Sequence, residues 1–215
     1  MKPRFISFEG SEGCGKSTQI AKLSQWLESR NQTVTCLREP GGTPLGEHVR
    51  DLLKHNPAGN GMEPESELLL FAASRAELVR KMIQPKLAAG FWVICDRFLD
   101  STTVYQGLAR KLDPARVDAI NLFAVGQTLP TLTLVLDLDA EEARERMQGR
   151  KAAHDPSDRM ENEPLAFYQS VTEGYRQLAH DYPERIKLIP AHGTREDVFQ
   201  TILKELTHAF PCLLD

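Results

Sequence analysis

No apolar stretch of the sequence approaches the roughly 18 residues that a membrane-spanning helix needs. The N-terminal stretch also lacks the charged region, long apolar region and cleavage site of a secretory signal. Cysteine is scarce, and the four cysteines form neither a CxxC pair nor a Cys/His metal-binding pattern: Cys14, Cys36, Cys95 and Cys212. These absences argue against a membrane protein, a disulfide framework and a zinc module. We therefore expect a soluble, cytoplasmic protein with reduced thiols.

An excess of basic residues is also absent. The 215 residues include 26 Lys and Arg against 30 Asp and Glu, which gives a formal net charge of −4. Proteins that hold a nucleic-acid polymer usually carry a basic stripe, so we expect no such partner. A local cluster of Arg, Lys and backbone amides can still bind a small anion. Hydrophobic residues make up 41% and composition does not shift along the chain, which predicts one domain over 1–215.

The apolar segments are short and alternate with helical patterns. Continuous runs rich in β-branched and aromatic residues predict five strands, at 4–10, 33–40, 91–98, 131–139 and 185–190. Helical periodicity lies between them, at 16–30, 43–54, 65–88, 99–110, 114–126, 139–149, 163–181 and 194–208. This order predicts an α/β fold in which helices cover both faces of a parallel sheet. Ligands of such sheets bind at the carboxyl ends of the strands.

One motif stands at the end of the first predicted strand. The stretch GSEGCGKS, residues 10–17, fits G-x-x-x-x-G-K-[ST] between a strand and a helix. Its glycines allow positive φ, which lets consecutive N–H groups surround a phosphate. Lys16 would contact the β- and γ-phosphates, and the Ser17 hydroxyl would bind Mg²⁺. A glycine-rich turn without a ligand is the alternative, but such a turn requires neither the lysine nor the hydroxyl.

Other motifs distinguish the functional classes of protein that contain this phosphate-binding loop. The [NT]-K-x-D motif of regulatory GTPases and the Asp-Glu strand end of motor ATPases are absent. Instead, Asp96 and Arg97 in ICDRF follow a predicted buried strand. Asp96 would hold a Mg²⁺-bound water, and Arg97 would bind a second anion through two parallel hydrogen bonds. The alternative is an ion pair that caps the strand.

Several stretches together resemble the thymidylate kinase family over nearly the whole chain. They are FEGSEGCGKST (8–18), REPGGTPLGE (38–47), FAASRAE (71–77), DRFLDSTTVYQG (96–107), LDLD (136–139) and DRME (158–161). The resemblance implies a P-loop nucleoside monophosphate kinase fold with a five-stranded parallel sheet flanked by helices. It also implies a homodimer that phosphorylates dTMP to dTDP with ATP and Mg²⁺ in dTTP biosynthesis. One departure is Phe98, which stands where tyrosine or histidine is frequent.

The resemblance also implies residue roles. ATP would be bound by Gly10, Ser11, Glu12, Gly13, Cys14, Gly15, Lys16, Ser17 and Thr18, and Mg²⁺ by Ser17 and Asp96. The dTMP site would consist of Arg38, Glu39, Pro40, Phe71, Arg75, Arg97, Ser101, Thr102, Tyr105 and Gln106. Phe71 would stack on thymine, Arg75 would hydrogen-bond its edge, and Tyr105 would disfavour a 2′-hydroxyl. Taken alone, Phe71 is more typical of a core aromatic than of a base-stacking residue. Tyr105 also fits a core aromatic, and Ser101 and Thr102 fit helix-start hydroxyls.

The catalytic residues implied by the resemblance are Lys16, Arg97, Glu12, Arg150 and Arg159. Turn-forming and basic residues at 149–161 predict a mobile lid at about 146–161, the alternative being a solvated loop. Because the loop carries Glu12 and Cys14 rather than an arginine, the chain resembles the family members whose lid supplies the arginines. The residues do not decide which of four lid cations acts: Arg146, Arg150, Lys151 or Arg159. We expect Cys14 to stay a neutral thiol without a catalytic role.

Two rival functions and one open question about assembly remain at this point. The nearest rival is a kinase for another nucleoside monophosphate, and a more distant one is a non-catalytic nucleotide-binding protein. The predicted helix 65–88 carries a broad apolar band, formed by Leu68, Leu69, Phe71, Ala72, Leu78, Val79 and Met82. A homodimer contact explains the band, and burial in the core explains it equally well.

Overall fold

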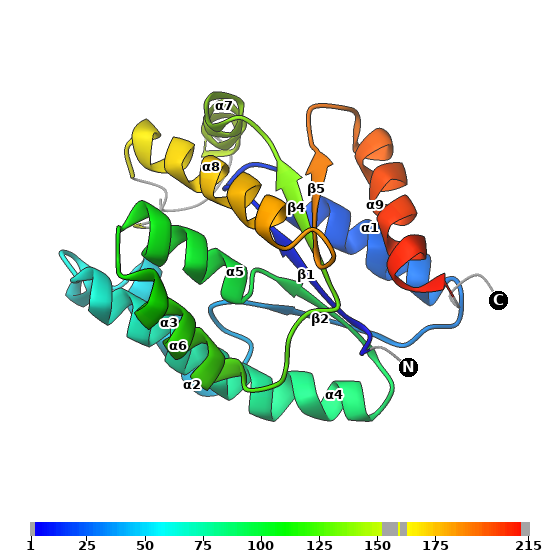
Figure 1. Cartoon of the computed structure of the whole chain (residues 1–215), viewed down its shortest axis with the longest axis horizontal. Helices are drawn as coiled ribbons and strands as arrows, with labels where there is room; N and C mark the ends of the chain where they lie inside the picture. The colour runs from blue at the N-terminus through cyan, green and yellow to red at the C-terminus, as the bar shows by residue number, and fades with distance from the viewer. Residues whose placement is uncertain (1–2, 152–158, 160–162, 212–215) are drawn as a thin grey trace.

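The computed structural model describes residues 3–151, 159 and 163–211. Its sheet consists of five strands: β1 (Phe5–Glu9), β2 (Val34–Arg38), β3 (Trp92–Asp96), β4 (Leu132–Asp137) and β5 (Ile186–Pro190). All neighbouring strands are parallel, in the order β2-β3-β1-β4-β5 (Figure 1). The five predicted strands and the parallel sheet are therefore confirmed. Each observed strand begins one residue later than predicted, and all but β5 end one or two residues earlier.

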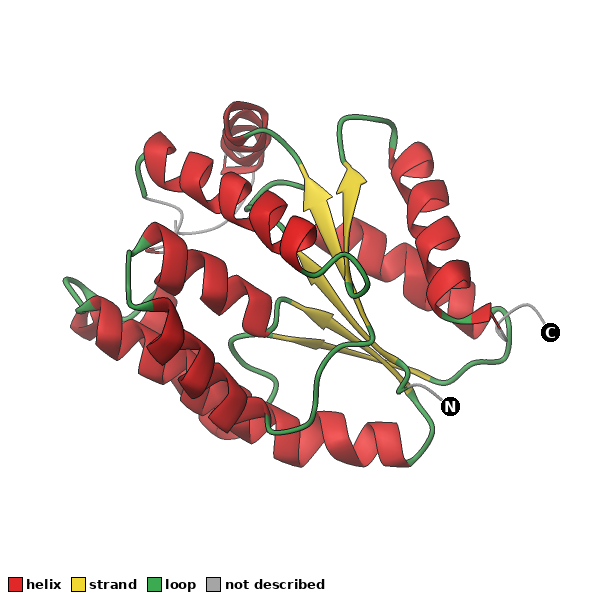
Figure 2. Cartoon of the chain, in the orientation of Figure 1, coloured by secondary structure: helices red, strands yellow, loops and turns green. Residues whose placement is uncertain are grey.

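Helices fill the intervals between the strands (Figure 2). They are α1 (Lys16–Glu28), α2 (Pro44–Lys54), α3 (Pro64–Leu78), α4 (Gln84–Ala88), α5 (Leu99–Thr102), α6 (Pro114–Val125), α7 (Ala140–Lys151), α8 (Leu165–Asp181) and α9 (Arg195–Ala209). Their starts follow local chemistry. In α2, the Thr43 hydroxyl accepts the Gly46 N–H at 3.0 Å, and Pro44 occupies the first position, where its missing N–H costs nothing.

Two predicted helices contain π-helical segments that the periodicity did not show. The first, Val79–Ile83 (η2), separates α3 from α4. Pro85 has no N–H to continue the α-helical ladder, and the Gln84 N–H reaches back five residues to the Val79 carbonyl. The second, Thr103–Ala109 (η3), follows α5 and carries Tyr105 and Gln106. The single helices predicted at 65–88 and 99–110 are thus wrong in detail, although both segments are helical throughout.

The two faces of the sheet pack against different helices. On one face, Ile6 and Phe8 join side chains from α1 and α9 in the largest core cluster. On the other face, Phe5 packs with residues of α3 and η2, and Val135 packs with residues of α8 and η3. Figure 1 shows α1 and α9 on one side of the sheet and α5 and α8 on the other. Continuous apolar runs were the correct signal, because both faces are buried.

Polar residues also tie the second face to the sheet. Asp100 in α5 is 3% exposed and forms an ion pair with Arg185, whose Nη1 lies 2.6 Å from Asp100 Oδ2. The Thr133 hydroxyl on β4 donates to the same carboxylate at 3.1 Å. These contacts tie α5 to β4 and to the residue that precedes β5. Within the described residues, no helix is both long and apolar enough to span a membrane.

Candidate active site

The segment between β1 and α1 forms the phosphate loop that the motif predicts. Gly10, Gly13 and Gly15 all have positive φ, at 128°, 81° and 101°. A Cβ atom on Gly10 would lie 2.7 Å from the Leu136 carbonyl oxygen, so a side chain is excluded there. Gly15 is the N-cap of α1, and a Cβ atom there would meet no atom within 4 Å. Glycine is favoured at this position because the backbone is in the left-handed region, and not because a side chain would clash.

Lys16, the first residue of α1, folds back over this loop. Its side chain is buried, and Nζ donates to the carbonyl oxygens of Gly10 at 3.1 Å and Ser11 at 2.9 Å. The ammonium charge and the N-terminus of α1 therefore lie on the same short loop, an arrangement suited to a phosphate chain. Cys14 is buried and belongs to the core cluster beneath the loop. Lys16 Nζ also lies 3.6 Å from the Cys14 Sγ atom.

A cavity of about 440 Å³ opens beside the loop and brings most of the predicted site residues together. Its wall includes Glu12, Gly13, Gly15, Lys16, Ser17, Thr18, Arg38, Glu39, Pro40, Phe71, Arg75, Asp96, Arg97, Ser101, Thr102, Tyr105 and Gln106. All ten residues predicted to bind dTMP line this cavity. Gly10, Ser11 and Cys14 do not line it, because they form the base of the loop. One cavity therefore joins the phosphate loop to the predicted nucleoside end.

A further group of basic residues, which we did not predict from the sequence, lines the cavity. Arg50, Lys54 and His55 at the end of α2 also line the cavity, and Arg50 Nη1 donates to the Pro40 carbonyl at 3.0 Å. A signal was present, because residues four apart share one face of a helix and α2 directly follows the REPGGT stretch. Arg38, which we predicted as part of the dTMP site, lines the cavity. Its Nη2 pairs with both Glu47 carboxylate oxygens, at 3.0 and 2.8 Å, while the side chain remains on the cavity wall.

Arg97 lies where the cavity approaches the phosphate loop. Its Nη2 donates to Glu12 Oε1 at 2.8 Å and to the Tyr105 hydroxyl at 3.0 Å. Burial alone would raise the pKa of Glu12, but the charges of Arg97, Lys16 and Lys54 outweigh burial and hold that pKa well below its usual range. Glu12 is therefore an anion throughout the neutral pH range. The pair fixes the Arg97 guanidinium against the loop.

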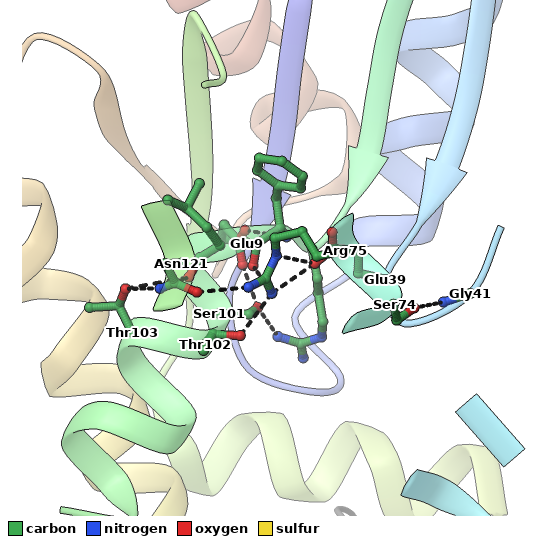
Figure 3. A network of polar contacts seen from close by, with 12 residues as sticks. Glu9, Glu39, Gly41, Ser74, Arg75, Ser101, Thr102, Thr103 and Asn121 are labelled. Carbon is green, nitrogen blue, oxygen red and sulfur yellow. Dashed lines mark hydrogen bonds and ion pairs between the residues drawn. The ribbon is translucent and has the colours of Figure 1, made fainter. Parts of the chain in front are cut away.

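Arg75 also lines the cavity and is 1% exposed. It donates to Glu39 Oε2 from Nε at 2.8 Å, to Asn121 Oδ1 from Nη1 at 2.8 Å and to Thr102 Oγ1 from Nη2 at 2.7 Å (Figure 3). Burial raises the pKa of Glu39 to about 7 in spite of the Arg75 charge. Asn121 has no motif in the sequence that marks it as part of this network. Phe71 lies one helical turn before Arg75 and shares the cavity wall.

The comparisons with known proteins agree with this geometry. A family model described as thymidylate kinase matches residues 8–202, which cover the loop, the cavity, the end of β1 and the other four strands. The chain belongs to the thymidylate kinase family. The fold predicted from the motifs is therefore confirmed, and so is the resemblance on which the expected roles depend.

Relatives match over nearly their whole length. A thymidylate kinase of Syntrophotalea carbinolica is 44% identical over 200 residues, 92% of each chain. One of Chlorobaculum tepidum is 45% identical over 206 residues, 94% of this chain and 95% of the relative. The crystal structure of thymidylate kinase from Ehrlichia chaffeensis aligns with a TM-score of 0.73 at 35% identity, covering 94% of this chain and 97% of that one.

Two oxygen donors of this thymidylate kinase fit a magnesium ion. Ser17 is the second residue of α1, Asp96 is the last residue of β3, and both line the cavity beside Lys16. The residues that the structure describes contain no group of three or more His, Cys, Asp and Glu able to hold a metal. Mg²⁺ commonly takes one or two protein oxygens and completes its shell with waters and substrate phosphates. The donor set fits a metal bound together with a nucleotide.

The predicted lid falls mostly outside the described part of the chain. Arg150 belongs to α7, but its side chain is not among the described ones, and residues 152–158 and 160–162 lie outside the description. Arg159 is described and does not line the cavity. It donates to the Leu53 carbonyl at 3.1 Å and forms an ion pair with Glu67. Glu67 also accepts the Gln106 amide at 2.8 Å, so this buried carboxylate connects Arg159 to the cavity wall.

Proposed function

We propose that this thymidylate kinase transfers the γ-phosphoryl group of ATP to dTMP and forms dTDP, as a step of dTTP synthesis. The observation that carries this proposal is one cavity whose wall holds the phosphate-loop residues together with Phe71 and Arg75. Arg97 lines the same cavity and contacts Glu12 of the loop. A donor and an acceptor nucleotide would therefore meet with their phosphates beside the same guanidinium.

The donor site follows from the loop. The amides of residues 10–18 and the N-terminus of α1 would hold the ATP phosphates, and Lys16 would contact the β- and γ-phosphates. Ser17 and Asp96 would hold Mg²⁺, which supplies positive charge to the phosphates as they approach. Gly10, Ser11 and Cys14 would contribute only main-chain groups, because they do not reach the cavity wall.

The acceptor site lies on α3, α5 and η3. Phe71 would stack on thymine, and Arg75 and Thr102 would meet its polar edge, with Gln106 nearby. Because Arg75 already has three side-chain acceptors, its guanidinium is rigid before the base arrives. Tyr105 would lie beneath the sugar. Arg38, Glu39, Pro40 and Ser101 would surround the remaining nucleotide atoms, and one Glu39 oxygen, Oε1, has no hydrogen-bond partner within the described structure.

The chemistry is mainly a matter of charge. The acceptor is a phosphate oxygen, and the second ionisation of a phosphate monoester has a pKa of about 6, so no strong general base is needed near neutral pH. Lys16, Arg97 and the lid arginines Arg150 and Arg159 would neutralise charge on the transferred group. Glu12 would orient Arg97 through the 2.8 Å contact. Lid closure that depends on the acceptor would limit hydrolysis of ATP by water.

A coupled assay for ADP release across a panel of monophosphates tests this function. We expect dTMP to give the highest kcat/KM, with dCMP, dGMP and AMP well below it, and chelation of Mg²⁺ to abolish turnover. A faster reaction with another monophosphate would assign the chain to the rival kinase class. Absence of ADP release with every acceptor would favour the non-catalytic alternative.

We also propose that the protein is a cytoplasmic homodimer. Most of the apolar band on α3 and η2 is core, since Leu68, Ala72, Leu78 and Val79 are buried. An apolar surface remains beside it. Phe123 and Leu122 on α6 are 88% and 55% exposed, and Leu69 on α3, which packs against α6, is 56% exposed. A second copy of the chain would cover this surface.

Sedimentation equilibrium tests the assembly. We expect a dimer at micromolar concentration and a monomer after Phe123→Asp, because a buried unpaired charge opposes association. Phe91→Asp, a change outside this surface, is the control and should remain dimeric. A monomeric wild-type protein would contradict the proposal.

A further inference from the structure

Glu9 is the last residue of β1, immediately before the phosphate loop. It has no exposed surface and does not line the cavity. Its carboxylate receives three hydrogen bonds from distant parts of the chain. Oε2 accepts the Ser101 hydroxyl at 2.5 Å (Figure 3). Oε1 accepts the Phe98 backbone N–H at 2.8 Å, and Oε2 also accepts the Tyr175 hydroxyl at 2.9 Å. Glu9 thus joins the phosphate-loop strand to α5 and α8.

The same two hydroxyls contact the Arg97 guanidinium. Arg97 Nη1 donates to Ser101 Oγ at 3.0 Å and to the Tyr175 hydroxyl at 3.3 Å. A hydroxyl has one proton and two lone pairs, and a guanidinium only donates. A carboxylate at position 9 accepts from both hydroxyls, which also lie 2.8 Å from each other, and this leaves hydroxyl lone pairs facing Arg97. The charge of Glu9 therefore sets the polarity of both contacts to the guanidinium.

We propose that Glu9 is a positioning residue for phosphoryl transfer, which orients Arg97 through the hydroxyls of Ser101 and Tyr175. This inference rests on the proposed function, because it assigns Arg97 a role at the transferred phosphate. Glu9 itself touches neither substrate. Its effect is to hold the Arg97 guanidinium at one angle, while Glu12 and the Tyr105 hydroxyl hold the other nitrogen.

The surroundings of Glu9 bring its pKa close to neutral, so its charge changes with pH in that range. Burial raises the pKa of Glu9 to about 7 and the Asp100 carboxylate raises it too, while the Ser101 hydroxyl, Arg97 and the Tyr175 hydroxyl act in the opposite direction. Arg185, which precedes β5, and Cys95 on β3 also face this carboxylate. Protonation of Glu9 would place a donor where both hydroxyls now donate. The Arg97 contacts should then weaken as the pH falls below about 7.

Glu9→Gln removes the charge and keeps the shape. The amide would present an N–H₂ group to the hydroxyls and turn their protons toward Arg97. We expect kcat to fall by about 10- to 100-fold, the usual cost of losing the partner that orients a functional group, with KM for dTMP and ATP within about threefold of wild type. Glu9→Asp, which keeps the charge, should recover part of the rate.

The pH profile separates positioning from a purely structural role. The wild-type kcat should fall as the pH drops through about 7, and Glu9→Gln should lack that fall, whereas ionisation of the dTMP phosphate affects both proteins equally. Asp100→Asn should shift the wild-type midpoint to lower pH, because it removes a charge that raises the pKa of Glu9. If Glu9 had only a structural role, Glu9→Gln would lower the melting temperature. The fall in kcat near pH 7 would persist in that variant, and Asp100→Asn would leave its midpoint unchanged.

Tyr175→Phe provides a second variant that retains the carboxylate. We expect its kcat to fall about tenfold, and the loss in the double variant with Glu9→Gln to equal that of Glu9→Gln alone, because the carboxylate acts through Tyr175 as well as Ser101. Wild-type kcat in either single variant, or the wild-type pH profile in Glu9→Gln, would overturn the inference. If Glu9→Gln does not fold, the kcat and pH profile of Tyr175→Phe decide. Failure of the wild-type enzyme to phosphorylate dTMP would instead contradict the proposed function.

Discussion

Arg97 Nη2 lies 2.8 Å from Glu12 Oε1, which joins the end of β3 to the phosphate loop. The Arg97 backbone has a φ of 69°, in the left-handed region that few residues other than glycine adopt. The Arg97 N–H donates to the Phe8 carbonyl at 2.9 Å, and this bond helps to hold the backbone there. The conformation aims the side chain across the sheet edge at the cavity. Placement of this guanidinium is central to our account of the enzyme.

Replacing Arg97 with lysine tests that placement. Lysine keeps the charge but loses the planar group that contacts Glu12 and Tyr105 with one nitrogen and Ser101 with the other. We expect kcat to fall by about 10²- to 10³-fold, less than the roughly 10³- to 10⁵-fold that a complete arginine contributes to phosphoryl transfer, because lysine keeps the charge. Steady-state kinetics with saturating ATP and dTMP would measure it. A lysine variant with wild-type kcat would show that charge alone is sufficient.

Phe71→Ala tests the thymine end of the cavity. Base–aromatic stacking is worth about 1–3 kcal/mol per base, so we expect KM for dTMP to rise by about 10- to 100-fold while KM for ATP changes little. Phe91→Ala is the matched control, because Phe91 is also partly buried but does not line the cavity. Equal effects of the two changes on KM would argue against stacking at Phe71.

The lid arginines should affect turnover more than binding. We expect the double change Arg150→Ala and Arg159→Ala to lower kcat at least 100-fold, because both charges would act on the transferred group. Dissociation constants for ATP and dTMP, measured by calorimetry, should stay within a few fold. Arg144→Ala, an exposed change on α7, is the control. A double variant that turns over at the wild-type rate would refute this role.

We expect Glu39 to make the free energy of unfolding depend on pH. Its pKa is raised to about 7 in the folded state from an ordinary 4.5, so folding favours the protonated form. The stability associated with this group is therefore fully present below pH 4.5 and is lost as the pH rises through 7. Relative to wild type, the free energy of unfolding of Glu39→Gln should rise by on the order of 3 kcal/mol between pH 4.5 and pH 8. Urea denaturation without ligands would measure it, and a constant difference would contradict the assignment.

We expect replacement of Thr194 to lower stability without lowering activity. Its hydroxyl accepts the Asp197 N–H at 3.2 Å, and the Asp197 carboxylate accepts the Thr194 N–H in return, which caps α9. Thr194→Ala should cost about 1 kcal/mol, or about 2–4 °C in Tm for a chain of this size, with kcat unchanged. Thr207→Ala, near the end of the same helix, should change stability by less than about 0.5 kcal/mol. Equal Tm values for the two variants would contradict the capping role.

Short-range patterns made much of this site predictable. The phosphate loop, the ICDRF strand end and the REPGGT turn each act over a few residues, and parallel strands bring their carboxyl ends to one edge. The cavity therefore contains residues that three separate motifs had marked, such as Lys16, Arg38 and Arg97. The strand positions were predictable for the same reason, because burial on both faces leaves a continuous apolar run.

The long-range relationships were not predictable. Glu9 and its three partners are separated by 89, 92 and 166 residues in the sequence. In the stretch FEG, Glu9 looks like the last residue of an ordinary strand. Asn121 likewise reaches Arg75 from another helix, 46 residues away. The π-helical segments depend on packing and on Pro85, which periodicity does not register. Such contacts become visible only when the helices are placed on the sheet.

A crystal structure with dTMP, Mg²⁺ and a non-hydrolysable ATP analogue is the most direct test of the account. We expect the thymine ring against Phe71, the β- and γ-phosphates of the analogue in the loop beside Lys16, and the dTMP phosphate within hydrogen-bonding distance of Arg97. A dTMP molecule bound outside this cavity, or a loop without phosphate at saturating analogue, would contradict it.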